Sequence, residues 1–379
     1  MMKTAVNATR GIVGGLFILS GLIKANDPIG LSYKMEEFFE VWNASLKDGS
    51  LLENFLHFLN AHALALSLLM NGLEIMAGIA LIIGWKRKFV LGLLLVLIVF
   101  FTFLTGFAYT SGKFKNCGCF GDCLPITPLT SFVKDLFLLA MIIFLLVKQR
   151  YIMPLMATRR MVLTLILTAL TIAGIQWYVL SYLPFVDCLP FKKQNNIVEQ
   201  MKIPANAVSD SFRMKFIYQR NGKKFEFGPE ELPADLASYT FIDRTQELVR
   251  QGNAEPPIKG FALTSLAGED FTSTILVEPA AILVFTLDFE NVSTWVSAFN
   301  KLYIEARKKN IPVFIVSAAA AKGKIITAPL LPEEVVFLTC DHTVVRTAAR
   351  TNPTFYLIRK GTVVAKQGAS KIDYLLPQL

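Results

Sequence analysis

Long apolar runs are concentrated in the first half of the chain. Five segments have the roughly twenty mostly apolar residues that a membrane-spanning helix needs, and these are residues 6–23, 64–84, 89–109, 131–147 and 161–182. From about residue 192 onward, short apolar runs alternate with charged residues, as in a globular domain. The pattern predicts an α-helical membrane bundle, a four-helix core plus a fifth transmembrane helix, followed by an α/β domain.

The composition fits a membrane protein better than a pair of soluble domains. Of 379 residues, 53% are hydrophobic and only 18% are charged, with a mean hydropathy of +0.48. The net charge of +9 comes largely from basic residues that flank the apolar runs, so we expect the lipid bilayer as partner and no nucleic acid. The first apolar run follows Lys3 and Arg10 and lacks a small-x-small pattern before Lys24, so we expect it to remain as a helix.

Charges beside the apolar runs predict the orientation. Basic residues gather at the N-terminus and within residues 85–88 and 148–160, which the positive-inside rule places in the cytoplasm, whereas residues 24–63 carry a surplus of acids. The chain is therefore expected in a bacterial inner membrane, with its N-terminus cytoplasmic and its C-terminal domain periplasmic. All five cysteines then lie on the oxidising side, and they are Cys117, Cys119, Cys123, Cys188 and Cys340.

The strongest chemical signal is a loop between the third and fourth spans that holds three cysteines. Gly118 and Gly121 allow positive φ in this loop, so that neighbouring thiols can approach each other. A bond between Cys117 and Cys119 would close a very small, strained ring, and Cys123 can pair with either more easily. Strained or exposed disulfides are the ones that exchange, so the loop is a candidate redox relay.

Residues on either side of this loop bear on the same chemistry. Thr127 and Pro128 look like the N-cap and first residue of the fourth spanning helix, whose positive end would favour the Cys123 thiolate. Cys188 follows the fifth span and is a candidate resolving thiol, or an unpaired cysteine. A structural disulfide in the loop stays open, and so does a metal site of three thiols whose fourth ligand is Cys188, His57 or His62; no metal is our preferred expectation.

Ionisable residues within the spans are a second signal. Glu74 lies midway along the second span, where a charge is costly and by default faces the bundle interior. It is a candidate proton relay or quinone contact, the alternative being a protonated acid bonded to Asn71. Lys134 and Asp135 are expected to snorkel from the first turns of the fourth span. Four phenylalanines of the third span suit either a quinone pocket or a lipid-facing surface, and they are Phe100, Phe101, Phe103 and Phe107.

Residues 21–28, Glu74 and residues 116–122 together resemble the DoxX/MauE family of small bacterial membrane proteins, over about residues 5–148. The resemblance implies a four-helix bundle, associated with quinone-linked sulfur oxidation in DoxX and with maturation of disulfide-rich methylamine dehydrogenase in MauE. The core is also similar to that of vitamin K epoxide reductase relatives, which pass electrons from thiols to quinone. By analogy, the reacting thiols are drawn from Cys117, Cys119 and Cys123, with quinone as the carrier.

The last part of the chain, about residues 256–379, resembles a thioredoxin-like domain of the TlpA or peroxiredoxin type. The resemblance rests on apolar runs at 281–286 and 311–317 and on Asn352-Pro353-Thr354, and it implies a cis peptide bond before Pro353. Where such domains carry Cys-x-x-Cys, this chain has no thiol at 288–292. We therefore expect a docking role for the domain and a buried, inert Cys340.

Residues 1–148 are thus predicted to form a four-helix membrane domain, and residues 149–188 a fifth span with its juxtamembrane segment. Residues 189–255 are predicted to form a small β-containing connector with a hairpin at Asn221-Gly222, and residues 256–379 the domain that resembles thioredoxin. One hypothesis is a periplasmic thiol redox protein that serves as a thiol:quinone oxidoreductase component. The other is a non-enzymatic assembly factor that binds a periplasmic client. A transporter is less favoured, because the sequence shows no internal repeat.

Overall fold

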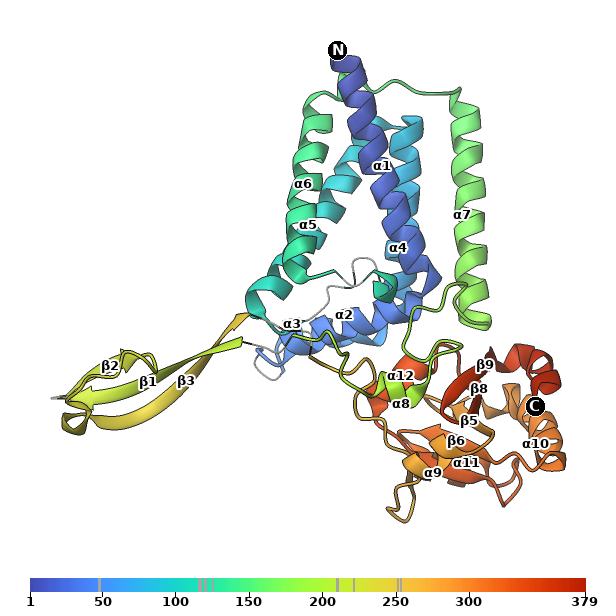
Figure 1. The fold of residues 1–379 in the computed structure, drawn as a ribbon. Coiled ribbons are helices and arrows are strands. Elements are labelled where there is room, and N and C mark those ends of the chain that lie inside the picture. Colours follow the sequence, from blue (N-terminus) through green and yellow to red (C-terminus); the bar gives the residue numbers. More distant parts are fainter. Residues whose placement is uncertain are drawn as a thin grey trace.

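The computed structural model describes residues 1–46, 49–114, 118, 121–124, 126–208, 211–220, 222–250, 252 and 254–379. Within these residues, five helices are long and apolar enough to cross a membrane, and they are α1 (Met2–Asn26), α4 (Ala63–Ile83), α5 (Arg87–Ser111), α6 (Pro128–Val147) and α7 (Thr158–Ser181). They run side by side, and the C-terminal region lies beyond one end of the bundle (Figure 1). The five predicted spans are confirmed, each within a few residues at its ends.

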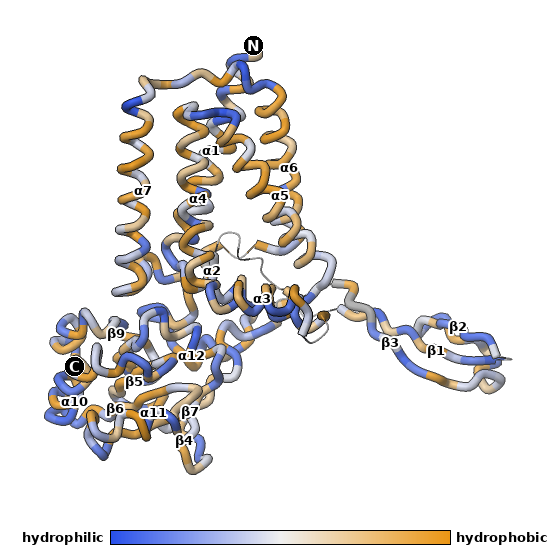
Figure 2. Tube along the Cα trace, turned by 180° about the vertical axis from the view of Figure 1, so that it is seen from behind, coloured by the Kyte–Doolittle hydropathy of each residue, from blue (hydrophilic) through white to orange (hydrophobic). Residues whose placement is uncertain are grey.

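Small residues allow the helices of the bundle to pack closely. A Cβ on Gly78 of α4 would lie 2.7 Å from the carbonyl oxygen of Gly14 in α1, so the two backbones nearly touch. The interior holds large apolar side chains, including Phe17, Leu94 and Ile142. The tubes of the five helices are coloured mostly hydrophobic (Figure 2), and many of their large apolar side chains are exposed, among them Leu69, Val96, Phe137 and Leu170. An apolar exterior of this kind is what lipid contact requires.

Two further helices, α2 (Pro28–Asn43) and α3 (Leu51–Ala61), lie across the end of the bundle that faces the C-terminal region (Figure 1). These two helices within the acidic segment 24–63 were not predicted from the sequence. Each helix has a side-chain cap, because Asp27 accepts a hydrogen bond from Gly30 N and Ser50 accepts one from Glu53 N. Large apolar side chains are exposed along α3, namely those of Leu51, Leu52, Phe55 and Phe58. Such a helix is suited to lie in a membrane interface.

Residues 211–250 form a three-stranded antiparallel sheet that extends away from the rest of the protein (Figure 1). Its order is β2-β1-β3, with the bounds β1 (Ser211–Arg220), β2 (Lys223–Phe227) and β3 (Thr240–Arg250). Strands β1 and β2 flank Gly222, whose φ of +77° suits the tight turn where the sequence predicts a hairpin. Asn221 lies outside the described residues.

The C-terminal region contains a six-stranded mixed sheet in the order β4-β7-β6-β5-β8-β9. Strands β5, β6 and β7 are parallel, whereas β4, β8 and β9 pair antiparallel with their neighbours. The strands are β4 (Thr264–Ser265), β5 (Ala281–Phe285), β6 (Val313–Ser317), β7 (Val336–Thr339), β8 (Thr354–Arg359) and β9 (Thr362–Gly368). The helices are α8 (Ile197–Gln200), α9 (Thr272–Val277), α10 (Val296–Lys308), α11 (Ala320–Thr327) and α12 (His342–Ala348).

Strand β5 is buried on both faces, as its unbroken apolar sequence predicts. Ile282 and Val284 belong to one apolar core with residues of α10, and Leu283 and Phe285 belong to a second core with residues of α12. The peptide bond between Asn352 and Pro353, directly before β8, is cis. Short 3-10 helices complete the structure, namely η1 (Gly121–Cys123), η2 (Gln149–Tyr151), η3 (Leu236–Ser238), η4 (Val292–Thr294), η5 (Ala369–Tyr374) and η6 (Leu376–Gln378).

Candidate functional site

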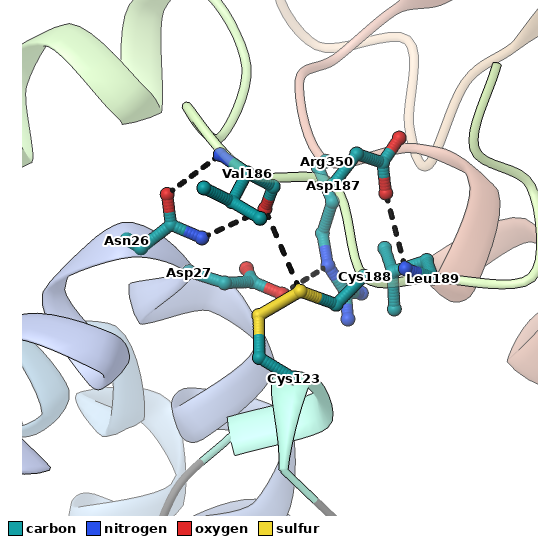
Figure 3. The surroundings of a disulfide bond; sticks show 8 residues. All are labelled: Asn26, Asp27, Cys123, Val186, Asp187, Cys188, Leu189 and Arg350. Carbon is teal, nitrogen blue, oxygen red and sulfur yellow. Dashed lines mark hydrogen bonds and ion pairs between the residues drawn. A yellow bond between two sulfur atoms is a disulfide. The ribbon is translucent and has the colours of Figure 1, made fainter.

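A disulfide bond joins Cys123 to Cys188, with 4.9 Å between the two Cα atoms (Figure 3). Cys123 ends η1, in the loop that connects α5 with α6, and Cys188 lies after α7. Gly118 and Gly121 both have positive φ, +68° and +56°, as their positions in the loop predict. The bond therefore ties the cysteine loop to the segment that leads from the last membrane helix into the C-terminal region.

The other cysteines differ in what the structure says of them. Cys117 and Cys119 lie outside the described residues. Cys340 is a free, buried thiol whose side chain is 4% exposed, and burial raises its pKa to about 11. Within the described residues, no group of three or more His, Cys, Asp or Glu side chains could hold a metal ion. His57 instead contacts the Asn43 amide, and His62 Nδ1 contacts the Phe58 carbonyl.

The end of α1 lies next to the disulfide and contacts the same segment (Figure 3). The Asn26 side chain both donates to the Val186 carbonyl at 2.8 Å and accepts from Val186 N at 3.0 Å. Asp27 caps α2 and also accepts a hydrogen bond from Arg350 Nε at 2.9 Å. Arg350, which is 4% exposed, belongs to the C-terminal region two residues before Asn352. Membrane and C-terminal parts thus meet at the disulfide.

A second ion pair widens this junction. Arg346 of α12 pairs with Glu36 of α2 and lies 3.6 Å from the centre of the Tyr33 ring. The Arg350 guanidinium is 5.4 Å from the same ring. Burial raises the pKa of the Tyr33 hydroxyl, and the two arginines oppose that rise. Two cations stacked near one aromatic face, each also paired with an acid, are a specific arrangement rather than a loose surface contact.

One helical turn before Asp27, Lys24 forms an ion pair with Glu74 inside the bundle. The two side chains are 4% and 1% exposed, and Lys24 Nζ also lies 4.5 Å from the centre of the Phe101 ring. The alternative in which Glu74 bonds to Asn71 is wrong, because Asn71 has no hydrogen-bond partner among the described residues. A paired charge at this depth is tolerable, whereas either charge alone would be costly.

A second acid lies deep in the same half of the bundle. Asp135 of α6 is 1% exposed, accepts a hydrogen bond from Thr105 at 3.0 Å and pairs with Lys134 at 2.7 Å. The expectation that Asp135 snorkels is therefore wrong. Thr127 does cap α6, by accepting a hydrogen bond from Thr130 N, as predicted. A cavity of about 20 Å³ borders both Glu74 and Asp135, which is room for about one water molecule.

In the C-terminal region, the segment after β5 makes hydrogen bonds to the side-chain amide of Asn352. Asn352 Oδ1 accepts hydrogen bonds from Thr286 Oγ1 at 2.6 Å and from Leu287 N at 3.0 Å. Asn352 also precedes the cis-bonded Pro353. This edge of the sheet is thus organised around an amide, and Cys340 is too deeply buried to supply a thiol there.

Several residues of the junction carry no marked sequence signal. Lys24 lies in the segment that carries the family resemblance, but nothing local marks Glu74 as its partner. Arg350 lies 323 positions from its partner Asp27. Asp187, which pairs with Lys366 of β9 at 2.8 Å, is one residue before Cys188. Only Asp27 offered a readable clue, because an acid followed by proline marks the start of a helix.

Comparison with known proteins characterises the membrane part. Residues 2–148 match the family model of methylamine utilisation protein MauE, and residues 212–251 match a domain of unknown function, DUF8463. No curated protein matches the chain. A crystal structure of a conserved protein of unknown function from Bacteroides fragilis is 19% identical over 30% of this chain and 93% of that chain, with a TM-score of 0.25, too low to indicate a shared fold. The N-terminal part is therefore MauE-like and the protein is a multi-pass membrane protein.

Removing only one charge of the buried Lys24–Glu74 ion pair should destabilise the bundle. Glu74→Leu leaves the Lys24 ammonium in an apolar interior without its partner, and such losses cost about 3–5 kcal/mol. We expect a clear fall in the thermal midpoint of the detergent-solubilised protein. The double variant Lys24→Met/Glu74→Leu removes both charges and should recover most of that loss. A single variant as stable as the unmodified protein would show that the pair contributes nothing to the fold.

Cys340 should be inert at ordinary pH. The thiolate is the reactive form, and with a pKa of about 11 only about one thiol in a thousand is ionised at pH 8. We expect native Cys340 to be alkylated far more slowly than after unfolding, with the rate rising about tenfold per pH unit between pH 7 and 9. Peptide mapping after timed alkylation measures this. Rapid labelling at pH 7 in the native protein would contradict it.

Proposed function

We propose that this protein carries out thiol/disulfide redox chemistry at the non-cytoplasmic surface of a bacterial inner membrane, passing electrons from protein thiols to a membrane carrier of the quinone class. The observation that supports this most is the position of the Cys123–Cys188 disulfide. It lies beside Asp27 and Arg350, where membrane and C-terminal parts meet, and Lys24 and its partner Glu74 follow one helical turn inward. The match of residues 2–148 to MauE is consistent with a membrane redox role.

The reaction sequence balances in two steps. A client dithiol reduces the Cys123–Cys188 bond, so that the client gains a disulfide and the protein gains two thiols. Those two thiols then give two electrons and two protons to a quinone, which leaves as quinol while the protein disulfide forms again. Exchange would pass through a mixed disulfide between one client thiol and either Cys123 or Cys188, which the second client thiol then breaks to leave the client disulfide and two protein thiols. Cys117 and Cys119, both outside the described residues, are further candidate thiols of the relay.

The ion pair beneath the disulfide is proposed to handle protons. Oxidation of two thiols releases two protons at the outer end of the bundle, and Glu74 is the nearest buried acid along α1 and α4 that can accept one. The small cavity next to Glu74 and Asp135 has room for a water molecule that would connect the two acids. It is far too small for a quinone ring. The buried Asn71 amide, which has no hydrogen-bond partner among the described residues, could instead bond a water molecule or the carbonyl oxygen of a ligand.

A thioredoxin-like fold for the C-terminal domain is part of the proposal. The parallel β5-β6-β7 strands, the antiparallel β8-β9 pair and the cis bond before β8 support it. Because residues 288–292 hold no thiol and Cys340 is buried, we assign this domain to binding of a client and not to dithiol exchange. The same features favour a second candidate, a non-enzymatic assembly factor in which the Cys123–Cys188 bond is only a clamp.

Quinone reduction by the purified protein separates the two candidates. We expect each molecule of the reduced, detergent-solubilised full chain to reduce about one molecule of a quinone analogue. The reaction is measured by the loss of quinone absorbance. The Cys123→Ser/Cys188→Ser variant lacks this thiol pair and should reduce no quinone analogue by way of it. Cys340→Ser serves as the matched control and should behave as the unmodified protein, because that thiol is buried away from the junction.

The Lys24→Met/Glu74→Leu variant tests the proton role, since its charges are removed together. It should lower the rate at least tenfold without a change in the number of quinones consumed. If the reduced, folded protein fails to reduce quinone at all while its clients still mature in cells, the redox proposal is wrong and the assembly-factor candidate is favoured.

A further inference from the structure

A cavity of about 440 Å³ lies between the outer end of α7 and the C-terminal region. One wall is formed by Tyr178 of α7, by Tyr182 directly after α7, and by the apolar segment 183–185. The other wall comes from the segment after the disulfide, from β9 and from η5. Figure 1 shows the end of α7 beside β9. The cavity thus lies at the depth where a spanning helix leaves the membrane.

Lysines dominate the polar lining of this cavity. Lys192, Lys193, Lys366 and Lys371 face one acid, Asp187, which leaves a formal excess of three positive charges. Asp187 is already engaged, because it pairs with Lys366 at 2.8 Å. Among the described residues, neither Lys192 nor Lys193 has an acidic partner, and both are exposed. The cavity therefore has unneutralised positive charge that a bound anion would satisfy.

Aromatic and apolar groups set the depth of this charge. Lys371 Nζ donates to the Tyr178 hydroxyl at 2.8 Å and lies 4.5 Å from the centre of the Tyr182 ring. Tyrosines at the end of a spanning helix typically sit at the level of lipid headgroups. Only 22% of the most apolar stretch of α7 is buried within the protein, so lipid acyl chains cover most of that helix and end beside the cavity.

We infer that this cavity binds the headgroup of an anionic phospholipid, with its phosphate between Lys192, Lys193 and Lys371 and its glycerol end against the apolar 183–185 segment. Basic pockets beside membrane helices recognise such headgroups through charge. A zwitterionic lipid brings a cation of its own and gains less from the excess of lysine. The bound lipid would hold the segment that carries Asp187 and Cys188 against the membrane, and the inference does not depend on the proposed redox function.

Lipid retention by the full-length protein tests the inference. The protein is purified in detergent with equal amounts of phosphatidylglycerol and phosphatidylethanolamine, and bound lipids are counted by native mass spectrometry. We expect preferential retention of phosphatidylglycerol. Lys192→Gln/Lys193→Gln should weaken that retention roughly 25-fold, since each lysine near a membrane surface contributes about a fivefold effect. The matched control Lys322→Gln/Lys324→Gln, which removes two exposed lysines of α11, should change nothing.

Three results would overturn the inference. The unmodified protein retains both lipids equally; the Lys192→Gln/Lys193→Gln variant keeps its preference; or 10 mM-scale inorganic phosphate displaces phosphatidylglycerol completely, which would indicate a site for small soluble anions. A circular dichroism spectrum and thermal midpoint equal to those of the unmodified protein show that the variant is folded, so a loss of lipid reports on the cavity itself.

Discussion

The junction between the membrane bundle and the C-terminal region rests on the ion pair of Asp27 with Arg350, next to the Cys123–Cys188 disulfide. Arg350 is almost fully buried, so its guanidinium requires the carboxylate of Asp27 in order to be tolerated there. Asp27 in turn fixes where α1 ends and α2 begins. A single side chain therefore sets the position of a membrane helix, a surface helix and a domain from the far end of the sequence.

The same constraint, that charge is costly in an apolar setting, explains the interior of the bundle. Lys24 and Glu74 neutralise each other, and Asp135 is held by Thr105 and Lys134. These groups contribute little to stability compared with well-packed apolar side chains. Their presence in the half of the bundle on the side of the cysteine loop therefore calls for a functional reason, and the proposed handling of protons from thiol oxidation would supply one.

Local patterns predict much of the fold, whereas long-range pairing is not accessible from them. The five spans follow from apolar length alone, and the positive φ of Gly118 and Gly121 follows from their place among cysteines. Helices α2 and α3 were missed because their surface sequence is mixed, although Ser50 with Glu53 is a readable capping signal. Which cysteine pairs with Cys188, and that Asp27 meets Arg350, depend on how distant segments dock, and no local propensity encodes that.

The most direct test of the central claim is the oxidation state of the Cys123–Cys188 pair in membranes whose quinone pool is switched between oxidised and reduced. Thiols are trapped with acid, tagged with a mass-shifting alkylating reagent and assigned by peptide mapping. We expect the pair to become reduced when the quinone pool is reduced and to return to the disulfide when the pool is reoxidised. A pair that stays fully oxidised in both conditions would contradict the account and leave the bond as a structural clamp.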